Sequence, residues 1–85
     1  MRIQILGVGC PKCRTLYENA EKAVAATGVD AVIERIRDIQ QIMTFDILVP
    51  PGLVVNGEVK VVGRVASVEE IKRLIEAAQE HGPPG

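Results

Sequence analysis

Aromatic residues are almost missing from this chain of 85 residues, which has no Trp, one Tyr and one Phe. An excess of either charge is missing too, since ten basic residues stand against eleven acidic ones and the formal net charge is −1. Proteins that bind single-stranded nucleic acid use aromatic side chains as stacking platforms and a basic groove for the phosphates. The composition therefore predicts no nucleic-acid partner.

Long apolar runs are also lacking, and no window approaches the roughly 18 uninterrupted apolar residues of a membrane span. The opening residues, MRIQILG, lack the basic and then apolar layout of a secretory signal. Two cysteines are too few for a disulfide-scaffolded secreted domain. We therefore expect a cytoplasmic protein with no membrane partner, and nothing in the sequence demands more than a monomer.

The length and the 47% hydrophobic content suit one compact core. No repeat, linker or low-complexity segment divides the chain. We predict a single domain over residues 1–80, followed by a flexible tail over 81–85 with the sequence HGPPG. The only histidine, His81, falls in this tail and is expected to be a solvated residue.

Apolar periodicity and helix-boundary signals predict seven elements. In chain order they are a strand over 2–6, a helix over 11–27, an edge strand over 31–37, a short helix of about two turns from residue 39 to near Phe45, strands over 53–55 and 59–62, and a helix from residue 68. The pair Asn56-Gly57 between two apolar runs is the signal of a type I′ hairpin. Ser67 followed by Glu70 is typical of a capping box at a helix start.

This order, β-α-β-α-β-β-α, predicts an α/β fold. The first two strands are joined through a helix, so a right-handed crossover makes them parallel. The hairpin then completes a four-stranded mixed sheet, with helices on both of its faces.

The chemistry-bearing motif is Cys10-Pro11-Lys12-Cys13, which lies where the first strand hands over to a helix. Proline is favoured at the first helical position, so Pro11 places Cys10 at the cap. Unpaired N–H groups and the positive end of the helix dipole both favour a thiolate there. Lys12 adds a positive charge beside it, so Cys10 is the expected nucleophile.

Cys13 lies about one turn further along the helix, within disulfide reach of Cys10 and more shielded by its own helix. This asymmetry predicts that Cys10 attacks a substrate disulfide and that Cys13 resolves the mixed disulfide. The partners would be protein disulfides or small thiols, with an unidentified reductase as electron donor. No cofactor is required.

Three other interpretations of the cysteine pair stay open. A purely structural disulfide is weak, because a loop of four residues contributes only about 2 kcal/mol and cytosolic conditions would reduce it. A site for a thiophilic metal such as copper(I) or mercury is the more serious rival, since paired thiolates bind such ions. A redox-sensing interaction module would keep the same two residues.

Three segments together resemble a known family: GVGCPKC after the first strand, PGLVVNGEVK in the middle, and GRVAS before the last helix. They look like the small single-domain thioredoxin-like or glutaredoxin-like redox proteins of prokaryotes. The resemblance implies a thioredoxin fold, disulfide exchange at Cys10 and Cys13, and a cis proline facing them, which Pro51 matches. It also places a set of residues at the substrate groove: Pro11, Lys12, Pro50, Pro51 and Gly63.

The chain departs from that family pattern at two points. In the family, the residue before the cis proline offers backbone groups to an extended substrate segment, whereas Pro50 has no N–H to donate. Ordinary thioredoxins also have a Trp before the first cysteine and a buried Asp under the site. This chain has Gly9 before Cys10 and no acid within residues 2–6, where Gln4 is the only uncharged polar residue.

Overall fold

The computed structural model describes residues 1–8, 11–45 and 49–80. Their elements follow the predicted order. In sequence they are β1 (Arg2–Leu6), α1 (Pro11–Thr27), β2 (Val32–Ile36), α2 (Ile39–Met43), β3 (Gly52–Val55), β4 (Glu58–Val62) and α3 (Val68–Glu80). The thiol predicted as nucleophile, that of Cys10, and the tail predicted over 81–85 lie outside the described residues.

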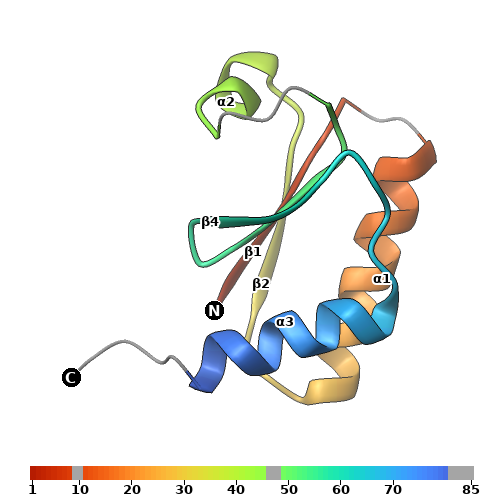
Figure 1. Cartoon of the computed structure of the whole chain (residues 1–85), viewed down its shortest axis with the longest axis vertical. Coiled ribbons are helices and arrows are strands. Elements are labelled where there is room, and N and C mark those ends of the chain that lie inside the picture. Colours follow the sequence, from red (N-terminus) through yellow and green to blue (C-terminus); the bar gives the residue numbers. More distant parts are fainter. Residues whose placement is uncertain (9–10, 46–48, 81–85) are drawn as a thin grey trace.

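The four strands form one mixed sheet in the order β2-β1-β3-β4. β1 and β2 run parallel, with Leu6 level with Ile36, as the crossover argument predicts. β3 runs antiparallel to both β1 and β4. β1 is an inner strand and ends at Leu6, so Gly7, the next residue, lies at the middle of one end of the sheet (Figure 1).

Helices cover both faces of this sheet, as predicted, and each face has its own apolar cluster. α1 and α3 pack on one face with β1, β3 and β4, through side chains that include Ile3, Leu16, Leu53 and Ile71. The short α2 packs on the other face, where Ile42 contacts a smaller cluster. Burial of a large aliphatic side chain contributes about 1.5–3 kcal/mol, so most of the apolar stabilisation comes from the α1 and α3 face.

The hairpin between β3 and β4 has the predicted geometry. Asn56 has a φ of 51° and Gly57 a φ of 84°, so both turn residues are left-handed as a type I′ turn requires. The Asn56 side chain also accepts a 2.9 Å hydrogen bond from the Arg2 backbone N–H. The hairpin tip is thereby tied to the beginning of β1.

The start of α3 corrects one expectation in part. The Ser67 hydroxyl accepts a 3.1 Å hydrogen bond from the Glu70 backbone N–H, which is half of a capping box. The Glu70 carboxylate accepts two hydrogen bonds from Arg64 instead, with N···O distances of 2.7 and 2.5 Å. A guanidinium two residues after β4 is a charged donor and offers two bonds, so it outcompetes a single backbone N–H.

None of the three described helices combines the length and apolar character needed to cross a lipid bilayer.

Candidate active site

Cys13 lies in the first turn of α1 and points into the protein, where only 3% of its surface is exposed. α1 begins at Pro11, as the sequence predicts, because proline fits the first helical position and needs no hydrogen-bond partner there. The neighbours Pro11 and Lys12 are both exposed. The helix start thus buries Cys13 and leaves Pro11 and Lys12 at the surface.

Gly7 is the residue that makes room for this cysteine. A β-carbon built at position 7 would overlap the Cys13 sulfur and stand 3.1 Å from the Cys13 β-carbon. The Gly7 backbone is fixed in place, since its N–H donates a 3.0 Å hydrogen bond to the Ile36 carbonyl of the neighbouring strand. The end of β1 is therefore packed directly against the cysteine.

The Pro50–Pro51 peptide bond is cis, and Pro51 is the cis residue. Pro51 is buried, while Pro50 is exposed. The Pro50 β-carbon lies 4.0 Å from the position that a β-carbon of Gly7 would take, so Pro50 and Cys13 both approach Gly7. The proline-led hairpin is on the same end of the molecule as the cysteine.

Gly63, the residue after β4, contacts the same proline segment. Its N–H donates a 2.8 Å hydrogen bond to the Pro51 carbonyl, and its φ is +74°, a left-handed value that favours glycine. A β-carbon there would meet the Val49 side chain at 3.5 Å. Gly63 therefore holds the backbone on both sides of Pro50.

Four of the predicted site residues thus come together: Cys13, Pro50, Pro51 and Gly63. Lys12 and Pro11 border them on the helix, and Cys10 lies outside the described residues. Sequence reasoning missed Gly7 as a contact of Cys13. A glycine at the end of the strand that leads into the cysteine motif was the available signal, because such a glycine often marks close backbone approach.

The buried side chains of the described residues are all apolar. Within residues 1–8, 11–45 and 49–79, no polar or charged side chain is buried, so none of them supplies a buried acid beneath the site. Tyr17, one turn after Cys13, is partly buried and packs against the larger apolar cluster. No group of three His, Cys, Asp or Glu side chains able to hold a metal ion occurs in the described part of the chain.

A charged pair fixes the loop that follows Gly63. Arg64 binds the Glu70 carboxylate with two hydrogen bonds and so links this loop to the first turn of α3. These bonds hold the pKa of Glu70 below its ordinary value and raise the pKa of Arg64. Both side chains are substantially exposed, so the pair orients the loop more than it stabilises the fold.

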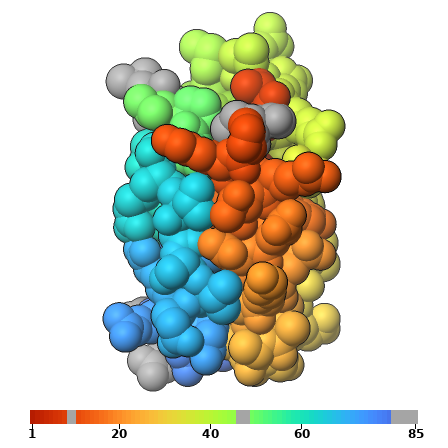
Figure 2. Space-filling model, turned by 90° about the vertical axis from the view of Figure 1, so that its right-hand side faces the viewer, coloured from red at the N-terminus to blue at the C-terminus, as the bar shows by residue number. Residues whose placement is uncertain are grey.

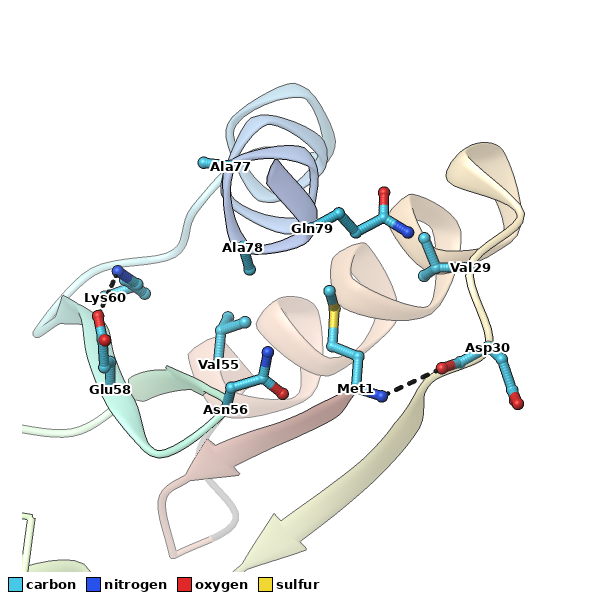
Figure 3. A pocket seen from close by; sticks show the side chains of 10 residues that line it. All are labelled: Met1, Val29, Asp30, Val55, Asn56, Glu58, Lys60, Ala77, Ala78 and Gln79. Carbon is cyan, nitrogen blue, oxygen red and sulfur yellow. Dashed lines mark hydrogen bonds and ion pairs between the residues drawn. The ribbon is translucent and has the colours of Figure 1, made fainter. Parts of the chain in front are cut away.

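The molecule also has an open hollow of about 810 Å³, but it lies away from Cys13 (Figure 3). Met1 and Val55 line it together with Ala78 of α3, and the Lys60–Glu58 ion pair stands at its edge. Met1 and Gly7 stand at opposite ends of β1, about 20 Å apart at 3.3 Å per residue. This hollow therefore takes no part in the chemistry of the cysteine.

Comparison with known proteins identifies the family of this chain. The profile of the thioredoxin domain family matches residues 1–76. The chain belongs to the thioredoxin family. It is 48% identical over 75 residues to a thioredoxin of Methanothermobacter thermautotrophicus, an alignment that covers 88% of this chain and 97% of the relative. It is 40% identical over 78 residues to a thioredoxin of Methanocaldococcus jannaschii, covering 92% of this chain and 90% of that protein.

Membership in the thioredoxin family confirms the expected fold, a four-stranded mixed sheet between helices in the order β-α-β-α-β-β-α. It also makes the chain a thiol-disulfide oxidoreductase. The thioredoxin assignment agrees with the resemblance in the sequence to small redox proteins of prokaryotes.

Proposed function

We propose that Cys10 and Cys13 are the redox-active pair and that they exchange electrons with protein disulfides or small-molecule thiols. Cys10 acts as the nucleophile and Cys13 as the resolving thiol. The observation that carries this proposal is the placement of Cys13, buried in the first turn of α1 with Gly7 and the Pro50–Pro51 segment beside it.

The exchange balances in two steps. The Cys10 thiolate attacks one sulfur of the substrate disulfide, an S–S bond forms between them, and the other substrate sulfur leaves and takes up a proton. Cys13 then gives up its proton and attacks the Cys10 sulfur, which releases the first substrate sulfur as a thiol. The substrate has gained two electrons, and the chain holds a Cys10–Cys13 disulfide.

The burial of Cys13 supports this division of roles. A thiol with 3% of its surface exposed cannot reach a disulfide on a separate protein. It can attack a sulfur only after that sulfur has been brought to the helix start as part of a mixed disulfide. We therefore assign the first attack to Cys10.

The substrate segment is proposed to lie over Pro50, Pro51 and Gly63, with Pro11 and Lys12 on its other side. Pro50 is exposed and its carbonyl is a hydrogen-bond acceptor, but it has no N–H. An extended substrate would thus form one backbone hydrogen bond fewer than with another residue at this position. Lys12 favours the thiolate of Cys10 by its charge.

The proposed setting is the cytoplasm, where cysteine pairs are kept reduced and a disulfide formed in one reaction is reopened for the next. A separate reductase would supply those electrons. The protein is proposed to act as a monomer and without a bound cofactor, since two thiols suffice for the exchange.

A trapping experiment tests the assignment. The Cys13→Ser variant should accumulate mixed disulfides through position 10 with an added peptide disulfide, whereas the Cys10→Ser variant should accumulate none. A mixed disulfide in the Cys10→Ser variant, or none in Cys13→Ser, would overturn the two roles. Mass spectrometry of the intact protein reads both results.

Two further measurements distinguish a protein that exchanges disulfides from one that binds and transports a thiophilic metal. The wild-type couple should equilibrate with redox buffers at a potential between about −270 and −180 mV, the range of thioredoxin-like proteins. Titration of the reduced protein with copper(I) should leave the rate of peptide disulfide reduction at substoichiometric metal largely unchanged. Tight copper(I) binding without any disulfide turnover would favour metal transport instead.

A further inference from the structure

Arg35 and Arg37 lie at the end of the edge strand β2, one inside the strand and one just after it. Side chains alternate along a strand, and Ile36 packs on the face covered by α2. Arg35 lies on the opposite face, where its guanidinium carbon stands 5.2 Å from the centre of the Tyr17 ring in α1. Arg37 directly follows the last residue of β2, Ile36, and is exposed.

Arg14 lies near Arg35 because it shares a side of α1 with Tyr17. Residues three apart on a helix are neighbours, and Arg14 is three before Tyr17. Its side chain is 80% exposed and has only a 4.0 Å contact with Glu18. The first turns of α1 and the end of β2 meet on one face of the molecule (Figure 2). Arg14 and Arg35 therefore share the Tyr17 side of α1, and Arg37 follows the end of β2.

Arg37 lies next to the thiol site. Gly7, which packs against Cys13, is hydrogen-bonded to the Ile36 carbonyl, and Arg37 is the next residue along. In the sheet order β2-β1-β3-β4, the cysteine stands at the end of β1, between its two neighbours. Arg37 is thus on one flank of the site and Pro50 on the other.

The charge of this region is opposite to that of the chain. We call the set Lys12, Arg14, Arg35 and Arg37 the basic rim. Two carboxylates are neighbours of these residues: Glu18 lies 4.0 Å from Arg14, and Asp38, next to Arg37 in the chain, caps α2 through a 3.0 Å bond from the Gln40 N–H. The rim region is positive by two charges while the whole chain has a net charge of −1. The remainder of the chain is therefore negative by three.

The basic rim supplies charged hydrogen-bond donors, and the proline side of the site lacks such donors. Pro50 cannot donate a backbone hydrogen bond, and the side chains around it are exposed and apolar, with Val8 at 55% and Val49 at 57%. Such contacts hold a substrate without selecting its sequence. Guanidinium groups, in contrast, bind carboxylates with paired hydrogen bonds and fixed geometry.

We propose that the basic rim selects protein disulfides whose cysteine is followed or preceded closely by acidic residues. This inference rests on the proposed function and names its substrate class. Two strand spacings separate β2 from β3, about 10 Å, which an extended segment spans in roughly three residues. A Glu or Asp within about three residues of the substrate cysteine therefore reaches Arg37 or Arg14 while the segment lies on Pro50.

Peptide disulfides that differ only in the two residues nearest the cysteine test this inference. They carry Glu, Gln or Lys at those positions. At low salt the Glu peptide should be reduced with a kcat/KM about five-fold above that of the Gln peptide, and the Lys peptide should be the slowest. At about 0.5 M salt the three values should converge, because screening shortens the reach of exposed charges.

Two variants with the same change in net charge separate local contact from general attraction. Arg37→Glu should abolish the ratio between the Glu and Gln peptides. Lys22→Glu, on an exposed position further along α1, should leave that ratio in place. If Arg37→Glu and Lys22→Glu show the same ratio of kcat/KM between the Glu and Gln peptides, the proposed role of the rim is wrong.

The neutral hydroxyethyl disulfide distinguishes this inference from the proposed function. If the wild-type protein reduces it together with all three peptides at equal rates, the selection by the basic rim is wrong and the disulfide exchange stands. If the wild-type protein reduces neither it nor any peptide, the proposed function itself fails.

Discussion

Gly7 and Cys13 are packed so closely that no side chain fits at position 7 without moving the sulfur. The contact joins the residue that follows the inner strand β1 to the first turn of α1. Gly7 has no positive φ, so its backbone would accept alanine, and only the cysteine stands in the way. The Cys13 thiol therefore occupies the space that a side chain at position 7 would need.

Substituting Gly7 should consequently disturb the cysteine before it disturbs the fold. Gly7→Ala in the reduced protein is expected to cost about 1–3 kcal/mol of unfolding free energy, because a forced side chain in a packed site strains its neighbours. It should also slow the release of substrate from the mixed disulfide, since Cys13 must rotate away. Urea titration and single-turnover kinetics measure the two effects.

A double-mutant cycle supplies the control. In a Cys13→Ala background the sulfur is gone, so Gly7→Ala should cost about 1 kcal/mol less than in the wild type. Identical costs in the two backgrounds would show that the strain lies elsewhere.

Pro50→Thr should improve the binding of peptide substrates. The threonine restores a backbone N–H at the exposed position beside the site, and one hydrogen bond contributes about 0.5–1.5 kcal/mol. KM for a peptide disulfide should fall by about two- to ten-fold. KM for hydroxyethyl disulfide, which has no peptide backbone, serves as the control and should change little. A variant that handles the peptide no better than the wild type would refute the idea that Pro50 loosens recognition.

Leu16→Ala should be severely destabilising. Leu16 is fully buried between α1 and the sheet, and truncation of such a side chain costs about 2–5 kcal/mol. Val32→Ala is the matched control, because Val32 is 61% exposed at the edge of the sheet and its truncation should change stability by less than about 0.5 kcal/mol. Thermal unfolding followed by circular dichroism compares them, and similar losses would contradict the assignment of the core.

The Arg64–Glu70 pair predicts a pH dependence. The folded-state pKa of Glu70 is lowered, so the pair contributes stability above the ordinary carboxyl pKa of 4.5 and loses it as the pH falls through the lower folded value. The melting temperature of Glu70→Gln should lie slightly below that of the wild type at pH 7 and approach it below pH 4.5. Glu76→Gln, on an exposed part of α3, should show no such trend. A constant difference across this pH range would contradict the linkage.

Local signals in the sequence were enough for most of the fold. Pro11 starts α1, Asn56-Gly57 makes the type I′ turn and Ser67 caps α3, because each of these effects depends on a few neighbouring residues. The buried position of Cys13 was equally predictable, since it follows from one helical turn after the cap.

Contacts between distant segments were the part that the sequence could not reveal. The overlap of position 7 with Cys13, the stacking of Arg35 on Tyr17 and the capture of the Glu70 carboxylate by Arg64 all depend on how the elements dock. The register shift between β3 and β4 at Leu53/Val54 is of the same kind. Apolar periodicity places a residue on a face of an element but does not say which residue of another element it meets.

The hollow beside Met1 has a practical consequence for handling the protein. Met1 and the last turn of α3 both line it, at the end of β1 remote from Cys13. A label, a linker or a solid support joined at either of these places therefore leaves the thiol face open to large partners. Immobilised protein should capture disulfide substrates in the same orientation as protein in solution.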